Sequence, residues 1–150
     1  MTRTETTSTQ DLSEQAARLR LAVNRMARRL RQEANSDLGP ASISALATIE
    51  RSGPLTPSEL ARIEGIRRPT ATRILGRLAE TGLVTRTADP SDGRCSIVQI
   101  TGDGRKALTR LRKRKTAYLA RKMRALGDDD VATLARAAEI LEQVLEEDRS

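Results

Sequence analysis

The segment from residue 67 to residue 77 concentrates arginine and threonine side chains and contains no acidic residue. An arginine can form two parallel hydrogen bonds to guanine O6 and N7, and a threonine offers a hydroxyl to a base or a methyl group to thymine. Arg73 and Arg77 are one helical turn apart, so a helix would place both on one face. The predicted major-groove contacts are Arg67, Arg68, Pro69, Thr70, Thr72, Arg73 and Arg77. The alternative is a basic helix face that is only solvated.

The segment Asp89-Pro90-Ser91-Asp92-Gly93-Arg94 has the composition of an exposed turn. A single arginine at the tip of such a turn suits insertion into a narrow minor groove, whose negative potential attracts a guanidinium. The carboxylate of Asp92 can accept a hydrogen bond from Arg94 and orient its guanidinium. The same residues are also good hairpin-turn formers, so the turn alone does not establish contact with DNA.

The composition of the 150-residue chain excludes several classes of enzyme and metal site. The chain has no histidine and a single cysteine, Cys95, so it cannot build a His-dependent catalytic set or a zinc site of the His or Cys-cluster type. We therefore expect no enzyme activity, no metal and no cofactor. We interpret Cys95 as an incidental strand residue.

The same composition predicts a soluble, basic, intracellular protein of a reducing cytoplasm. One cysteine cannot form an intramolecular disulfide, as is typical of a reducing compartment. No apolar run approaches the roughly 18 residues that a membrane span needs, so no membrane partner is expected.

Charge is distributed unevenly along the chain, whose formal net charge is +7. Residues 105–126 carry ten basic and no acidic side chains, whereas residues 127–150 carry two basic and eight acidic ones. A basic block of this kind is typical of surfaces that bind nucleic acid or an acidic membrane. The alternative is a solvated helix face that pairs with the acidic helix after it.

A short helix is expected immediately before the candidate major-groove segment. Thr56-Pro57-Ser58-Glu59 has a helix-start pattern, with the threonine as N-cap, the proline at the first helical position and the glutamate three residues after the cap. Leu60 and Ile63 are expected to face the core. Gly65 is expected to end this helix in the left-handed conformation.

The elements that follow predict a winged helix-turn-helix. A second helix is expected over about 67–81, followed by strands at 83–87 and 96–100. Two short helices joined by a glycine turn form a helix-turn-helix, and a hairpin directly after them is the arrangement of a winged helix. The predicted fold class is mainly α with a small β-hairpin wing.

Apolar stripes on both sides of this region indicate helices that pack against a partner. The N-terminal stripe consists of Leu12, Ala16, Leu19, Val23, Met26 and Leu30. The C-terminal stripe consists of Val131, Leu134, Ala135, Ala138, Leu141 and Leu145. For the N-terminal segment, an ordinary core-facing helix is the alternative. The stripes are more extensive than one small winged helix needs, which favours burial between two chains.

The predicted organisation has four segments within one compact domain per chain. Residues 1–10 are expected to be a flexible tail and residues 11–39 a dimerisation helix. Residues 40–100 are expected to form the winged helix-turn-helix DNA-binding region, and residues 101–150 the C-terminal dimerisation helices.

The order of these elements, the segment RPTATRILGRLAETGLV at residues 68–84 and the turn at 89–94 resemble the MarR family of multiple-antibiotic-resistance-type regulators. The resemblance covers about residues 12–147. It implies a homodimeric winged helix-turn-helix repressor of the bacterial cytoplasm, associated with the nucleoid, that binds a pseudo-palindromic operator in double-stranded DNA. Carried over by position, residues 67–77 would lie in the major groove and Arg94 in the minor groove, with Asp92 orienting Arg94. The chain departs from the family pattern at Ser91, where the family often has an arginine.

The resemblance also implies release from DNA by a small aromatic or phenolic ligand. The lack of histidine and the late position of the only cysteine disfavour zinc sensing and oxidation sensing. The candidate ligand-binding residues are Arg25, Met26, Arg29 and Tyr118. A non-specific architectural DNA-binding protein is the first alternative function, and a partner-binding protein that has lost DNA contact is the second.

Overall fold

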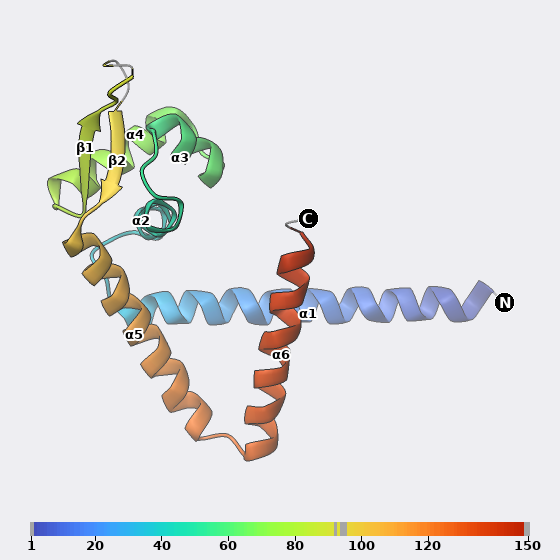
Figure 1. The fold of residues 1–150 in the computed structure, drawn as a ribbon. Coiled ribbons are helices and arrows are strands. Elements are labelled where there is room, and N and C mark those ends of the chain that lie inside the picture. The colour runs from blue at the N-terminus through green and yellow to red at the C-terminus, as the bar shows by residue number, and fades with distance from the viewer. Residues whose placement is uncertain (1, 92, 94–95, 149–150) are drawn as a thin grey trace. The chain divides into compact units, whose positions relative to one another are not determined.

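The computed structural model describes residues 2–91, 93 and 96–148, and this part of the chain forms six helices and one antiparallel hairpin (Figure 1). The elements are α1 (Thr2–Ala34), α2 (Pro40–Ser52), α3 (Pro57–Glu64), α4 (Arg68–Glu80), β1 (Val84–Ala88), β2 (Ser96–Ile100), α5 (Gly102–Arg124) and α6 (Asp128–Glu147). The mainly helical fold with a hairpin wing is therefore confirmed. No helix within the described residues is long and apolar enough to cross a membrane.

The chain divides into two compact units, Met1–Lys115 and Thr116–Ser150. The core of the first unit lies between α2, α3, α4, the hairpin and the start of α5. Its largest fully buried side chains are Leu46, Ile49, Leu60, Leu75, Leu78, Val98 and Leu108. Leu108 joins this core from α5, and the boundary between the units falls within α5.

Helix α3 begins and ends as the sequence predicts. Thr56 Oγ1 accepts a hydrogen bond from the backbone N–H of Glu59 at 3.2 Å, and Pro57 is the first helical residue. Gly65 follows the helix with φ +65° and ψ +33°, in the left-handed region, and its N–H bonds to carbonyl groups of the last turn. A glycine adopts this conformation without the steric cost that a Cβ imposes, so it turns the chain sharply into α4.

The position of Ile63 differs from the expectation, because its side chain is 43% exposed. The buried residues of α3 are Leu60 and Ala61. At about 100° per residue, Ile63 lies to one side of the face that those two residues share. The expectation that Ile63 faces the core is therefore wrong.

The hairpin is anchored, at the middle of β2, to the segment between α2 and α3. Strands β1 and β2 pair with Val84 opposite Ile100 and Ala88 opposite Ser96. Leu55, between α2 and α3, exchanges two backbone hydrogen bonds with Val98 at 3.1 and 2.8 Å. This bridge fixes the hairpin against the helix-turn-helix.

Helix α5 starts in close contact with the loop between α4 and β1. Thr101 Oγ1 donates to the carbonyl of Gly82 at 2.7 Å and accepts the N–H of Gly104 at 3.0 Å, so it caps α5. A Cβ at Gly104 would collide with the carbonyl oxygen of Leu83 and with Ile100. Only glycine allows the first turn of α5 to approach the chain this closely.

Helix α1 starts earlier than the sequence suggested. Residues 2–10, expected as a flexible tail, belong to α1, which runs from Thr2 to Ala34. Serine and threonine favour a helix only weakly, but no glycine or proline interrupts this stretch. Extension of an existing helix adds a hydrogen bond per residue without a new nucleation step, which accounts for the longer helix.

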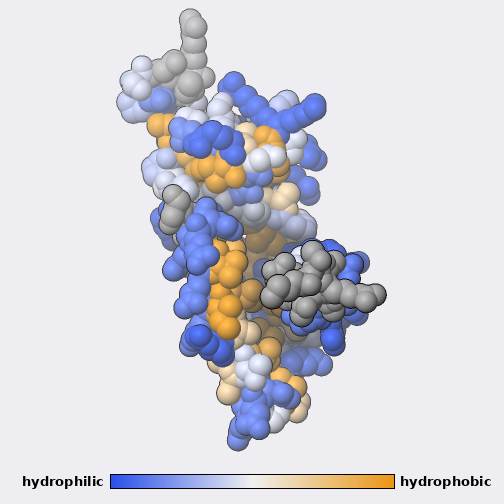
Figure 2. All heavy atoms as spheres, turned by 90° about the vertical axis from the view of Figure 1, so that its right-hand side faces the viewer, coloured by the Kyte–Doolittle hydropathy of each residue, from blue (hydrophilic) through white to orange (hydrophobic). Residues whose placement is uncertain are grey.

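The apolar stripes of α1 and α6 are exposed within one chain. On α1, Leu12 and Leu19 are 66% and 52% exposed. Helix α6 has no buried residue, and its exposed side chains include Leu134, Leu141 and Leu145. Figure 2 shows a hydrophobic stripe flanked by hydrophilic side chains along this helix.

Candidate DNA-binding surface

Helix α4 buries one face and exposes the opposite face. Ala71, Ile74, Leu75 and Leu78 are buried in the core of the first unit. Arg73 and Arg77, on the opposite face, are exposed. The apolar contacts therefore hold the helix so that both guanidinium groups project into solvent, where a duplex can approach.

The start of α4 adds further exposed polar groups. Arg67 is the N-cap residue in an extended conformation, and Pro69 lies in the first turn, where its missing N–H is not needed. Arg67 and Arg68 are exposed, whereas Thr70 is half-buried. Thr72 donates its hydroxyl to the carbonyl of Arg68 at 3.0 Å, so its methyl group and the oxygen lone pairs remain available for a base.

A hydrogen-bond cluster fixes α3 against α2. The carboxylate of Glu64 accepts hydrogen bonds from Ser44 Oγ at 2.7 Å and from Thr48 Oγ1. Thr48 is only 2% exposed, so its hydroxyl has little access to water. This cluster holds the end of α3, and with it the turn that sets the direction of α4.

Arg86 is a residue that the sequence analysis missed. It lies on β1, and its Nη2 donates to the carbonyl of Thr72 on α4 at 3.4 Å. The same nitrogen lies near Gly76, where a Cβ would stand 3.9 Å away. A signal was available, since Arg86 is two residues after the buried Val84 and thus shares its face of the strand.

The turn of the wing is described in part. Both the N–H and the hydroxyl of Ser91 donate to Asp89 Oδ1, at 2.9 and 2.7 Å. This local pair closes the first half of the turn. Asp92, Arg94 and Cys95 lie outside the described residues, so their predicted roles stay predictions.

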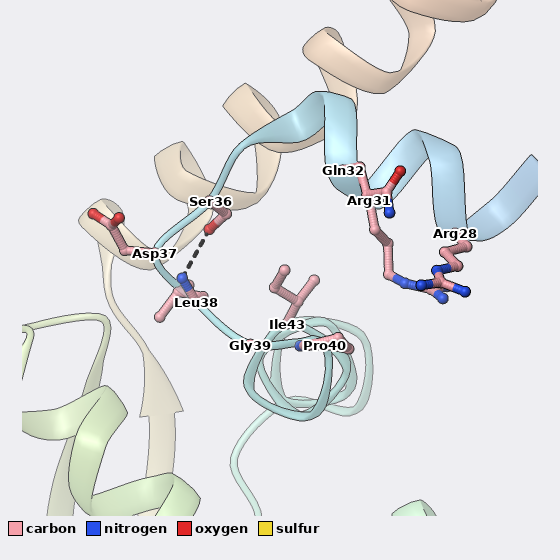
Figure 3. Close-up of a pocket in the computed structure, with 9 residues that line it drawn as sticks. All are labelled: Arg28, Arg31, Gln32, Ser36, Asp37, Leu38, Gly39, Pro40 and Ile43. Carbon is pink, nitrogen blue, oxygen red and sulfur yellow. Dashed lines mark hydrogen bonds between the residues drawn. The ribbon is translucent and has the colours of Figure 1, made fainter.

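A pocket of about 450 Å³ opens where α1 leads into α2 (Figure 3). It is lined by Arg28, Arg31, Gln32, Ser36, Asp37, Leu38, Gly39, Pro40 and Ile43. In Figure 3 the two arginine side chains lie together on one side, and the carboxylate of Asp37 points away from them. The pocket therefore combines positive charge with an apolar contribution from Leu38 and Ile43.

The four candidate ligand-binding residues do not line this pocket. Arg25 and Met26 are exposed on α1. Arg29 forms an ion pair with Glu33 at 2.7 Å. Tyr118, in the second unit, is 9% exposed, and the centre of its ring lies 5.4 Å from the guanidinium carbon of Arg121. Their assignment to a ligand remains a prediction.

The acidic residues do not gather into a metal site. Within the described residues, no group of three or more His, Cys, Asp or Glu side chains could hold a metal ion.

The sequence of this chain is similar to those of known proteins. Residues 38–96 match the sequence model of the MarR family. An uncharacterised HTH-type transcriptional regulator of Mycobacterium leprae is 33% identical over 133 residues, which cover 88% of this chain and 93% of that protein. The multiple antibiotic resistance protein MarR of Salmonella typhimurium is 32% identical over 106 residues, 67% of this chain and 74% of that protein.

A similar structure has also been solved. The crystal structure of a proposed transcriptional regulator from Pseudomonas aeruginosa superimposes with a TM-score of 0.81 at 35% sequence identity. The match covers 91% of this chain and 97% of that chain. The match therefore extends over most of both chains.

Proposed function

Because the chain belongs to the MarR family of DNA-binding transcriptional regulators, we propose that it is a homodimeric repressor of a pseudo-palindromic operator. We also propose that a small ligand releases it from that operator. In this proposal, α4 contacts DNA in the major groove and the wing contacts it in the minor groove.

The exposed face of α4 is the observation that carries this proposal. Arg73 and Arg77 project from a helix whose other face is anchored by four buried side chains. Such a helix can enter a major groove without disturbing the core, and each arginine can donate two hydrogen bonds to a guanine. Glu80, at the end of α4, is the first acidic residue after Glu64, so the face presents positive charge to the duplex.

The exposed stripes on α1 and α6 support a homodimer. A helix with an apolar face is stable when that face is buried, and α6 buries no residue within its own chain. A second copy offers an identical pair of stripes, and two-fold dimers are the commonest assemblies of this kind. A two-fold axis would place two copies of α4 about 34 Å apart, one turn of DNA.

The proposal is tested by selecting bound fragments of genomic DNA and measuring affinity for the selected site. A specific regulator should prefer that site over random duplex by roughly 10³-fold or more. Arg73→Ala and Arg77→Ala should each weaken operator binding by about 1–3 kcal/mol. Arg136→Ala is the matched control, because Arg136 is exposed on α6 and pairs only with its neighbour Glu139 among the described residues. A preference near one would instead favour an architectural protein.

Repression and dimerisation have separate readouts. Addition of the protein to a purified transcription system should lower the yield from a promoter that carries the selected site, and a rise would indicate an activator. Light scattering should give twice the 16.5 kDa chain mass. Leu141→Glu should reduce that mass, because it places a charge in the proposed apolar interface.

The wing makes a second contact in this proposal. Arg94 would insert into the minor groove, with Asp92 orienting its guanidinium. The bonds from Ser91 to Asp89 support an ordered turn that can present such a side chain. Arg94→Ala should weaken operator binding by about 1–3 kcal/mol. Unchanged affinity at fixed salt would contradict the wing contact.

The pocket between α1 and α2 is the site that we propose for the ligand. Its volume of about 450 Å³ is in the range of small-molecule sites. Arg28 and Arg31 favour an aromatic ligand that carries a carboxylate or phenolate, because a guanidinium pairs well with either anion. A ligand here would contact both the long helix α1 and the first helix of the DNA-binding region.

Benzoate and neutral phenol are suitable probes of this pocket. Benzoate should weaken operator binding in a saturable manner, and Arg31→Ala should remove this response. Arg25→Ala is the control, because Arg25 does not line the pocket. A response that depends on Arg25 and not on Arg31 would place the ligand elsewhere on α1.

A further inference from the structure

The first half of α5 carries a strongly basic face. This face takes no part in the operator contacts proposed for α4 and the wing. This α5 basic face is made up of Arg105, Lys106, Arg110 and Lys113, with Thr109 among them, and these five residues line a hollow of about 380 Å³. The four cations are exposed. Lys106, Arg110 and Lys113 lie on the side of the helix away from Leu108 and Leu111, which are buried, and Arg105 lies at the edge of that side.

The charge of this face is not neutralised by ion pairs among the described residues. Arg112, one residue away, pairs with Glu50 on α2 at 2.9 Å. For Arg105, Lys106, Arg110 and Lys113, by contrast, no ion pair is found among the residues that the structure describes. Asp103, in the first turn, is the only acid on α5.

The chemistry of this face points to the phosphate backbone of a nucleic acid rather than to a protein. The core of a protein interface is depleted of charge and contains aromatic or other apolar anchors. Every residue that lines the hollow is polar, and four of the five are cations. Backbone binding needs only such cations, and it is independent of sequence.

The dimensions of the face suit a strand of DNA. The helical rise from Arg105 to Lys113 is about 12 Å. Phosphates follow one another about every 3.4 Å of axis along one strand, so three to four of them pass over this length.

The face is also distinct from the surface that reads the operator. Helix α5 begins directly after β2, at the end of the hairpin opposite the wing turn (Figure 1). The recognition residues lie on α4, whereas the four cations lie on α5 beyond Thr101. A duplex held by the α5 basic face therefore needs no contact with Arg73 or Arg77.

We propose that the α5 basic face is a second, sequence-independent binding surface for duplex DNA. A protein bound to its operator would then hold a second duplex segment through α5. The inference does not require a particular operator, since the contact is with phosphates.

The test measures capture of a second duplex by the full-length protein. The protein is first saturated with its selected operator at low salt, and a labelled 30-base-pair random duplex is then added. The unaltered, operator-saturated protein is expected to capture the labelled duplex. Arg73→Ala, which is assayed without operator, is expected to capture it as well. R110Q/K113Q should reduce capture, and the slope of log K against log salt should become shallower by about 2 per chain.

R18Q/R20Q is the matched control, because it removes the same charge from exposed positions on α1. This variant should capture the random duplex with an unaltered salt slope. Equal loss in both variants would overturn the proposal, since net charge alone would then explain binding. Absence of any capture by the operator-saturated protein would also overturn it.

Two further outcomes would assign the face to another partner and overturn the proposal. A lower assembly mass of R110Q/K113Q would show that the face contacts a second copy of the chain. Binding of poly-glutamate through Arg110 and Lys113, without capture of duplex, would indicate an acidic protein. If no preferred site is found, the comparison of R110Q/K113Q with R18Q/R20Q on the random duplex alone still tests this inference, so its failure and that of the proposed function are distinguishable.

Discussion

Arg86 on β1 donates a hydrogen bond from Nη2 to the carbonyl oxygen of Thr72 on α4 at 3.4 Å. The wing strand is thereby joined to the middle of the recognition helix. The bond is long and exposed, so its contribution to stability is small. Its role is positional, because it links the two elements that are proposed to enter adjacent grooves of the operator.

Arg86→Ala should lower the free energy of unfolding by no more than about 1 kcal/mol, because a single exposed hydrogen bond is lost. Operator affinity should fall more than stability, since α4 and the wing lose a contact that fixes their relative position. Urea unfolding and operator titration measure the two effects. Arg86→Lys is the control for charge, because an ammonium cannot reproduce the planar fork of a guanidinium. Full affinity in the lysine variant would show that charge alone matters at this position.

Two glycines in helices should respond in opposite ways to alanine. Gly104→Ala places a Cβ against the carbonyl oxygen of Leu83, where the backbone cannot yield easily, and should cost about 1–3 kcal/mol of stability. Gly76→Ala places a Cβ at an ordinary contact distance of 3.9 Å from Arg86 Nη2. It should stabilise the chain by about 0.4–1 kcal/mol through the higher helix propensity of alanine.

Thermal or urea unfolding of both glycine variants at one protein concentration checks this pair. The concentration must be equal, since dimerisation would shift the midpoint by mass action. A stable Gly104→Ala variant would mean that α5 moves away from Leu83 without loss. A destabilised Gly76→Ala variant would mean that the Arg86 contact does not tolerate the methyl group.

Local signals account for the parts of the fold that the sequence predicted well. The start of α3 depends on Thr56 and Pro57 and its end on Gly65, and each acts on backbone groups within four residues. The start of α1 was missed because a weak helix-forming segment was extended from a strong neighbour. Ile63 was misplaced because an eight-residue helix offers too few residues to define its buried face.

The candidate site shows the same division between local and distant information. Helical spacing alone predicted that Arg73 and Arg77 share an exposed face, which the structure confirms. The pocket that contains Arg28 and Arg31 arises from the approach of two helices and the loop between them. Spacing along α1 indicates which residues lie on its polar side, but not which of those residues face α2. The sequence therefore could not separate Arg28 from Arg25.

Arg114 offers a test of how α1 is attached to the rest of the first unit. Its Nη1 donates to the carbonyl of Ala34 at 2.8 Å and lies 3.4 Å from the carbonyl of Asn35. These carbonyls lie at the C-terminal end of α1, where the helix dipole favours a cation and the last carbonyl groups lack helical partners. Ala34 is 1% exposed, so water cannot readily replace the lost donor.

Arg114→Ala should therefore cost about 1–2 kcal/mol of stability, because it leaves a buried carbonyl without its charged donor. Arg112→Ala is the matched control two residues away: it breaks the exposed ion pair with Glu50, which is worth at most about 1 kcal/mol. Urea unfolding at a fixed protein concentration compares the two variants. Raised salt should reduce the loss of stability caused by Arg112→Ala, since screening acts mainly on exposed charges. Most of the loss caused by Arg114→Ala should remain. Equal losses in the two variants would mean that Arg114 contributes only surface charge and that α1 is held by its other contacts.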